Sequence, residues 1–141
     1  MNKAQDAILI TGATGQQGGA TARALLAAGH HVVAMTRNPS SENALALGAL
    51  GTEVIRGDLD DETSLRSALE GKWGVFALQN TWEAGVEEEE EQGKRLARLA
   101  KEAGVQHFVY ASVASADKDT GIPHFDNKHR VEETVRELGF P

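Results

Sequence analysis

The sequence predicts an α/β fold whose parallel sheet is doubly wound, with about five strands in the order 3-2-1-4-5. Short apolar runs alternate with longer segments of helical period along the 141 residues, and a glycine follows most of the helical segments. The apolar fraction of 40% and the charged fraction of 25% are ordinary for a globular chain. We therefore expect residues 1–141 to form one domain with helices on both faces of the sheet.

Five apolar runs are the predicted strands. The first reads AILIT, and such a short, branched and uninterrupted run is typical of a strand buried on both faces. The expected strands cover residues 7–11, 31–36, 52–56, 73–78 and 106–111.

Segments of helical period separate the strands. The first has alanine and leucine at helical spacing and is followed by Gly29, which suits a helix end. The expected helices cover residues 15–28, 42–50, 61–69, 86–103 and 127–138. A sixth strand would be expected after the last helix, where the chain stops.

Composition excludes several classes of function. The formal net charge of −7 and the absence of a basic stripe argue against nucleic-acid binding. The absence of cysteine excludes disulfide scaffolds, cysteine zinc sites and thiol nucleophiles, and the histidines show no metal-ligand spacing. The apolar stretch near the N-terminus is too short for a signal peptide or membrane span, so we expect a cytoplasmic protein without a membrane partner. The five consecutive glutamates at 87–91 indicate a solvated helix start or an acidic patch for a partner.

The segment between the first strand and the first helix is rich in glycine. Gly12 suits a sharp turn off the strand, Gly15 lets a pyrophosphate approach the backbone, and Gly18 or Gly19 allows the helix to pack closely on the sheet. The helix N-terminus behind the loop offers N–H groups to phosphates. The pattern favours a Rossmann-type dinucleotide site over an ordinary tight turn, and no Gly-Lys-Ser/Thr follows that would indicate a P-loop.

The end of the second strand indicates which dinucleotide is bound. Arg37 follows that strand, and no carboxylate occurs before Glu42. A guanidinium pairs with a 2′-phosphate that a carboxylate would repel, so NADP(H) is favoured and NAD(H) is tolerated. The alternative is an exposed arginine at a strand end.

Acidic residues follow the third strand, where a doubly wound sheet borders the adenine. Asp58 either accepts a hydrogen bond from the adenine amine or caps a helix, and Leu59 can pack on the ring. Asp61 is the expected cap of the next helix.

Together with these segments, three later ones resemble the NmrA-like proteins, atypical members of the short-chain dehydrogenase/reductase superfamily. That family includes redox-sensing regulators that bind NADP(H) and NAD(P)H-dependent quinone and phenylpropanoid reductases. The segments that carry the resemblance are residues 12–19, 36–39, 57–61, 79–83 (QNTWE), 109–112 (VYAS) and 124–128 (HFDNK).

The resemblance implies a role for individual residues around the cofactor. They are Gly12, Thr14, Gly15, Gln16, Gln17 and Gly18 at the pyrophosphate, Arg37 at the 2′-phosphate, Asp58 and Leu59 at the adenine, Asn80 and Thr81 near the nicotinamide ribose, and Lys128 at the ribose hydroxyls or the nicotinamide. Family members often carry a second basic residue soon after the arginine, where this chain has Ser40, Ser41 and Glu42. They also continue for a second half with the substrate-binding region, so we expect this chain to be the cofactor-binding part alone.

Reductases of the wider superfamily use Tyr-x-x-x-Lys with a serine, and here the spacing is His124-x-x-x-Lys128 with Ser112 upstream. His124 is either a proton donor or a loop residue, Lys128 a cofactor ligand or a solvated lysine, and Ser112 a pocket or a turn hydroxyl. The missing tyrosine favours a non-catalytic redox sensor that a partner protein reads. The alternative is an oxidoreductase that reduces a quinone or carbonyl. A free sheet edge would also allow a homodimer.

Overall fold

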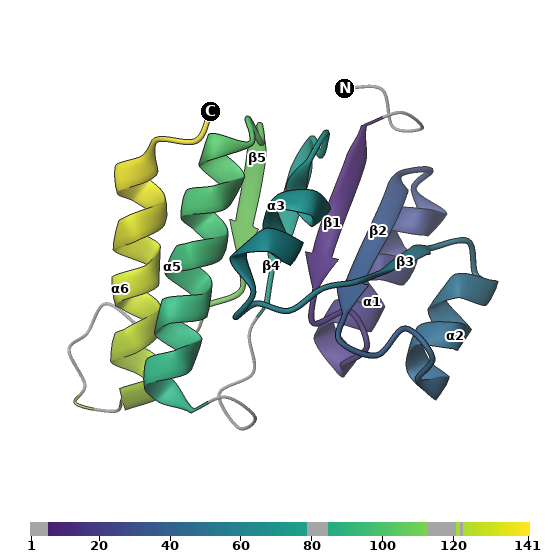
Figure 1. Cartoon of the computed structure of the whole chain (residues 1–141), viewed down its shortest axis with the longest axis horizontal. Helices are drawn as coiled ribbons and strands as arrows, with labels where there is room; N and C mark the ends of the chain where they lie inside the picture. Colours follow the sequence, from purple (N-terminus) through teal and green to yellow (C-terminus); the bar gives the residue numbers. More distant parts are fainter. Residues whose placement is uncertain (1–5, 79–84, 113–120, 122) are drawn as a thin grey trace.

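The computed structural model describes residues 6–78, 85–112, 121 and 123–141. Its five strands form one parallel sheet in the order β3-β2-β1-β4-β5, which confirms the predicted topology (Figure 1). β1 is buried along its whole length, because it lies in the centre of the sheet with helices on both faces. The strands are β1 (Ala7–Thr11), β2 (His31–Thr36), β3 (Glu53–Arg56), β4 (Gly74–Ala77) and β5 (His107–Tyr110).

The helices cover the sheet in two layers. They are α1 (Gln16–Ala27), α2 (Glu42–Ala49), α3 (Glu62–Leu69), α5 (Val86–Glu102) and α6 (Pro123–Leu138). Alternate residues of β1 point to opposite faces, so Ile8 and Ile10 join one apolar cluster with Leu47 of α2, while Leu9 joins the other with Leu96 of α5. α6 packs along α5, on the side of α5 that faces away from α3 (Figure 1). Among the described helices, none combines the length and the hydropathy that a membrane span requires.

Most predicted boundaries agree with the structure within about two residues, which is the usual uncertainty of a helix or strand end. α6 is the exception, because it begins at Pro123 and not at residue 127. Proline is favoured in the first turn of a helix, where its missing N–H needs no partner, and this start signal lay in the sequence. The predicted cap of α3 is confirmed: Asp61 accepts hydrogen bonds from the backbone N–H groups of Thr63 (3.1 Å) and Ser64 (3.4 Å).

The glutamate run at the start of α5 does not form a uniformly solvated helix start. Glu87, Glu88 and Glu91 are exposed, but Glu89 is completely buried. The prediction is wrong at this residue because α6 covers one face of α5.

Candidate functional site

The glycine loop leaves β1 at the carboxyl edge of the sheet. Gly12 has φ +65°, a conformation that favours glycine, so the chain turns sharply there. The buried Thr11 hydroxyl donates to the Leu78 carbonyl at 2.9 Å and accepts from the Leu78 N–H at 2.8 Å. The start of the loop is thereby tied to the end of β4, a link that the sequence did not indicate.

Gly18 brings α1 against this loop. A Cβ at that position would lie 2.1 Å from the Gly12 carbonyl oxygen, so no other residue fits without moving the backbone. A Cβ on Gly15 would meet only the Gly12 oxygen, at 3.5 Å, and the outer side of the loop is therefore open. No side chain of the described residues caps the N-terminus of α1, and its first turn holds no acidic residue. These features fit a pyrophosphate on the loop.

The remaining predicted residues of the glycine loop lie at its surface. Gln16 and Gln17 are exposed, and Thr14 is half-buried. The Asn43 side chain, from α2, donates to the Thr14 carbonyl at 3.0 Å. The glycine loop is thus fixed from a helix that lies about thirty residues further along the chain.

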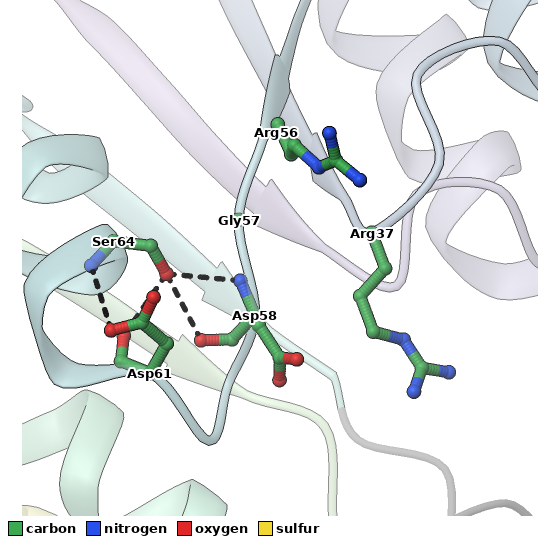
Figure 2. Close-up of a pocket in the computed structure, with 6 residues that line it drawn as sticks. All are labelled: Arg37, Arg56, Gly57, Asp58, Asp61 and Ser64. Carbon is green, nitrogen blue, oxygen red and sulfur yellow. Dashed lines mark hydrogen bonds between the residues drawn. The ribbon is translucent and has the colours of Figure 1, made fainter.

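Arg37 lies in the turn after β2, which is held by its own side chains. The Asn38 N–H donates to Thr36 Oγ1 at 3.2 Å, and the Ser40 N–H donates to Asn38 Oδ1 at 3.1 Å. The Arg37 side chain is exposed and lines an open pocket of about 390 Å³ (Figure 2). We call this the arginine pocket, and its lining residues are Arg37, Arg56, Gly57, Asp58, Asp61 and Ser64.

Asp58 lines the arginine pocket and does not cap α3, because Asp61 holds that position. One Asp58 carboxylate oxygen accepts from the Asp60 N–H at 2.9 Å, and its backbone N–H donates to Ser64 Oγ at 3.0 Å. The adenine interpretation of Asp58 stays a prediction. Leu59 is half-buried and packs against the apolar cluster beneath it.

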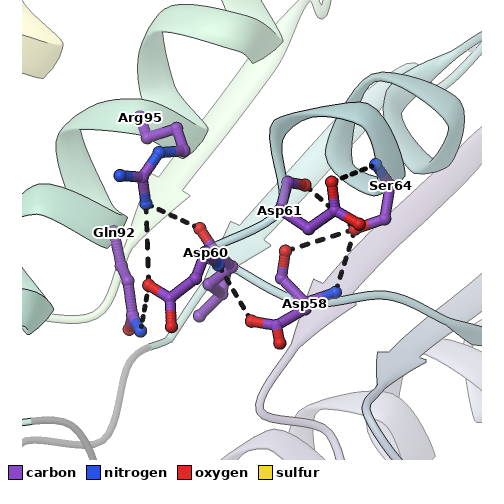
Figure 3. Close-up of polar contacts among 7 residues, drawn as sticks. Asp58, Asp60, Asp61, Ser64, Gln92 and Arg95 are labelled. Atoms are coloured by element: carbon purple, nitrogen blue, oxygen red, sulfur yellow. Dashed lines mark hydrogen bonds and ion pairs between the residues drawn. The ribbon is translucent and has the colours of Figure 1, made fainter.

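The loop that carries Asp58 is held from α5 (Figure 3). Arg95 donates to the Leu59 carbonyl at 2.8 Å, and Gln92 donates to the Asp60 carboxylate at 3.1 Å. These two contacts from α5 therefore hold in place the loop that is predicted to border the adenine.

The other half of the predicted site is a buried cluster beside α6. The Lys128 ammonium forms an ion pair with the Glu89 carboxylate, and their side chains are 10% and 0% exposed. Lys128 is therefore not a solvated lysine. Its Nζ lies 6.0 Å from the centroid of the Tyr110 ring. Glu89 is a residue that sequence reasoning missed, because only the packing of α6 on α5 distinguishes it from its neighbours.

Tyr110 is not poised to give up a proton. Burial raises the pKa of its phenol, and the negative charges of Glu89, Glu132 and Glu90 raise it further. Its hydroxyl and that of Ser112 are buried, and neither has a hydrogen-bond partner among the described residues. Asn80, Thr81 and the His124 side chain lie outside the part of the chain that the structure describes.

Solved structures that match nearly the whole chain include two complexes with a nicotinamide dinucleotide. NmrA, a negative transcriptional regulator solved in complex with NADP, has a TM-score of 0.85 and 29% identity, over 98% of this chain and 44% of that one. The NADPH-dependent quinone oxidoreductase QOR2 of Escherichia coli, solved with NADPH, has a TM-score of 0.81 and 32% identity, over 94% and 46%. NmrA has also been solved in complex with NAD.

Among curated proteins, the NmrA-like family domain-containing oxidoreductase hkm9 of Aspergillus hancockii is 38% identical over 138 residues. The match covers 92% of this chain and 41% of that protein, so the chain spans less than half of the relative's length. The model of the NmrA-like family matches residues 4–141. The chain, with its parallel sheet and glycine loop, therefore belongs to the NmrA-like family, as its motifs predicted.

Proposed function

We propose that this chain binds NADP(H) along the carboxyl edge of its sheet and accepts NAD(H) more weakly. The observation that carries the proposal is the pairing of two features at that edge. Gly18 packs against Gly12 below an open loop, and Arg37 stands at the end of the next strand beside the arginine pocket. This is the order in which a doubly wound sheet meets a pyrophosphate and an adenosine 2′-phosphate.

Each end of the cofactor would meet different residues. The residues from Gly12 to Gly18 would hold the pyrophosphate with backbone N–H groups, and Arg37 would pair with the 2′-phosphate. Asp58 and Leu59 would face the adenine. At the nicotinamide end, the predicted residues are Asn80, Thr81, Ser112 and Lys128. When bound, the nicotinamide supplies a hydride or accepts one.

The function that we propose is redox sensing, in which the occupancy of the site is read by a partner protein. Two observations support a non-catalytic role. The Lys128 ammonium is engaged by Glu89, and the pKa of the nearby Tyr110 phenol is raised. Neither group is therefore ready to deliver a proton during hydride transfer.

The second candidate is an NAD(P)H-dependent oxidoreductase. It is favoured by the likeness to QOR2 and by relatives that are named oxidoreductases. In this case Lys128 or His124 would donate the proton that accompanies the reduction of a quinone or carbonyl. Cytoplasmic localisation and a homodimer through a free sheet edge stay predictions.

One experiment separates the two candidates. The chain is incubated with NADPH and a panel of quinones, and the absorbance at 340 nm is followed beside a binding titration. A sensor binds NADPH tightly without consuming it. Turnover that is lost in both Lys128→Ala and Lys128→Arg, with folding checked by circular dichroism, would favour the oxidoreductase. Failure to bind either nucleotide would contradict the proposal as a whole.

A further inference from the structure

The end of β3 places a second arginine beside Arg37. The parallel register pairs Thr36 of β2 with Arg56 of β3, and the Gly57 N–H donates to the Thr36 carbonyl at 3.0 Å. Gly57 is buried, and a Cβ there would lie 2.5 Å from the Met35 sulfur, so the Met35 side chain of β2 packs directly on the backbone of Gly57. Arg37 and Arg56 consequently leave adjacent, hydrogen-bonded strand ends.

Both arginines line the arginine pocket. In Figure 2 the Arg56 side chain extends from β3 toward the turn that carries Arg37. Arg56 is exposed, so rotation about its side-chain bonds costs little and its guanidinium can follow a ligand. Within the described part of the chain, no ion pair engages it.

The acidic residues of the pocket are bound to backbone N–H groups. The Asp58 carboxylate accepts from the Asp60 N–H at 2.9 Å, and the Asp61 carboxylate accepts from the Thr63 N–H at 3.1 Å. Neither carboxylate forms an ion pair with Arg56, and both are fixed by local turns. The positive charge of Arg56 therefore stays available to an anion that enters the pocket.

A 2′-phosphate has enough charge and enough acceptor oxygens to bind more than one cationic side chain. A phosphate monoester carries a charge of about −1.5 to −2 near neutral pH and has three acceptor oxygens. One guanidinium binds two of those oxygens in a fork, which leaves the third for another donor. The sequence between Arg37 and Arg56 contains no lysine or arginine, so Arg56 is the next basic residue along the chain after Arg37.

We propose that Arg56 is a second binding residue for the cofactor's 2′-phosphate and helps to set the preference for NADP(H) over NAD(H). It supplies a second guanidinium to the arginine pocket, from the strand next to the one that Arg37 follows. The inference rests on the proposed function, because it names a further residue of the same site.

The test is a calorimetric titration of the whole chain with NADP⁺ and NAD⁺, carried out on the wild type and on Arg56→Ala, Arg56→Lys and Arg98→Ala. Arg98 is exposed on α5, away from the pocket, and controls for the loss of one positive charge. We expect Arg56→Ala to weaken NADP⁺ binding about tenfold and to change NAD⁺ binding less than about twofold. Arg56→Lys should recover only part of the loss, since an ammonium cannot bind in a fork. Arg98→Ala should leave both affinities unchanged.

Two results would overturn the inference. One is an unchanged NADP⁺ affinity in Arg56→Ala. The other is an equal loss of affinity for NADP⁺ and NAD⁺, which would indicate a general effect on the fold or on the electrostatic potential of the protein. Repeating the NADP⁺ titrations with adenosine 2′-monophosphate checks the phosphate directly, and this ligand should show the same dependence on Arg56. A wild-type chain that binds neither dinucleotide would overturn the proposed function together with the inference. An unchanged ratio of the NADP⁺ affinity to the NAD⁺ affinity in Arg56→Ala would overturn the inference alone.

Discussion

The region from β1 to α3 directs its polar groups toward open pockets, whereas the region from β4 to α6 pairs many of them with one another. In the first region, Arg37 and Arg56 line a pocket of about 390 Å³ and the glycine loop is open on its outer side. In the second region, Lys128 and Glu89 form a buried ion pair next to the Tyr110 ring.

This difference between the two regions indicates that dinucleotide binding and proton delivery depend on different parts of the molecule. Phosphate binding depends on backbone N–H groups and on arginines at strand ends, which the fold of this region provides by itself. Proton delivery depends on which groups the Lys128 ammonium contacts, and the packing of α6 on α5 places Glu89 against it. The first region is therefore expected to bind a dinucleotide whether or not the second supports turnover.

The largest effect on stability is expected from breaking the buried pair. Lys128→Met should lower the free energy of unfolding by about 3 kcal/mol, because it leaves the buried Glu89 carboxylate without its ammonium. The double variant Lys128→Met, Glu89→Leu should regain a large part of that loss, since no buried charge remains. Urea denaturation gives the values. A loss below about 0.5 kcal/mol in the single variant, which is typical of an exposed lysine, would contradict the pairing.

The next effect tests the glycine loop. Gly18→Ala should lower the free energy of unfolding by about 2 kcal/mol and abolish tight dinucleotide binding, because its Cβ would be 2.1 Å from the Gly12 oxygen. Gly48→Ala is the matched control. Its Cβ on α2 would meet Val54 at an ordinary 3.9 Å, so it should stabilise the fold by up to about 1 kcal/mol. Equal stabilities for the two variants would refute the close packing of loop and helix.

A smaller effect is expected at the link between α2 and the glycine loop. Asn43→Ala removes the 3.0 Å hydrogen bond to the Thr14 carbonyl and should weaken NADP⁺ binding about fivefold, since one hydrogen bond contributes about 1 kcal/mol. Leu45→Ala, which changes an exposed residue of the same helix, serves as the control. An Asn43→Ala affinity within error of the control would show that the loop keeps its conformation without this link.

The smallest effect concerns pH. Burial opposes ionisation of Glu90, but hydrogen bonds from Lys94 and Arg130 outweigh it and lower the pKa of its carboxyl below the usual 4.5. A pKa that is lower in the folded state stabilises the fold above pH 4.5, and the contribution is lost as the pH falls through the folded-state value. Glu90→Gln should therefore reduce the loss of stability in acid by about 0.5 kcal/mol. Glu91→Gln, at an exposed position, should leave the acid profile unchanged, and identical profiles for the two variants would contradict the assignment.

Features that depend on local sequence were predictable, and features that depend on pairing between distant elements were not. The sheet order follows from alternating strands and helices, and Gly12, Gly18 and Asp61 act within a few residues of their partners. In contrast, Arg56 comes to line the arginine pocket through its register with Thr36, which the sequence does not show.

The same holds for Asn43 and Glu89. The hydrogen bond from Asn43 spans 29 residues of sequence, and the Lys128–Glu89 pair spans 39. Glu89 stands in a run of identical residues, and nothing near Asn43 in the sequence points to Thr14, so only the packed structure identifies these two contacts. The early start of α6 is a different case, because Pro123 is itself a local signal for the first turn of a helix.

The most direct test of the account is a calorimetric titration of the wild type and Arg37→Ala with NADP⁺ and NAD⁺. We expect the wild type to prefer NADP⁺ and Arg37→Ala to lose most of this preference while it still binds NAD⁺. Equal affinity of the wild type for both nucleotides, or an unchanged preference in Arg37→Ala, would show that the arginine pocket does not recognise the 2′-phosphate.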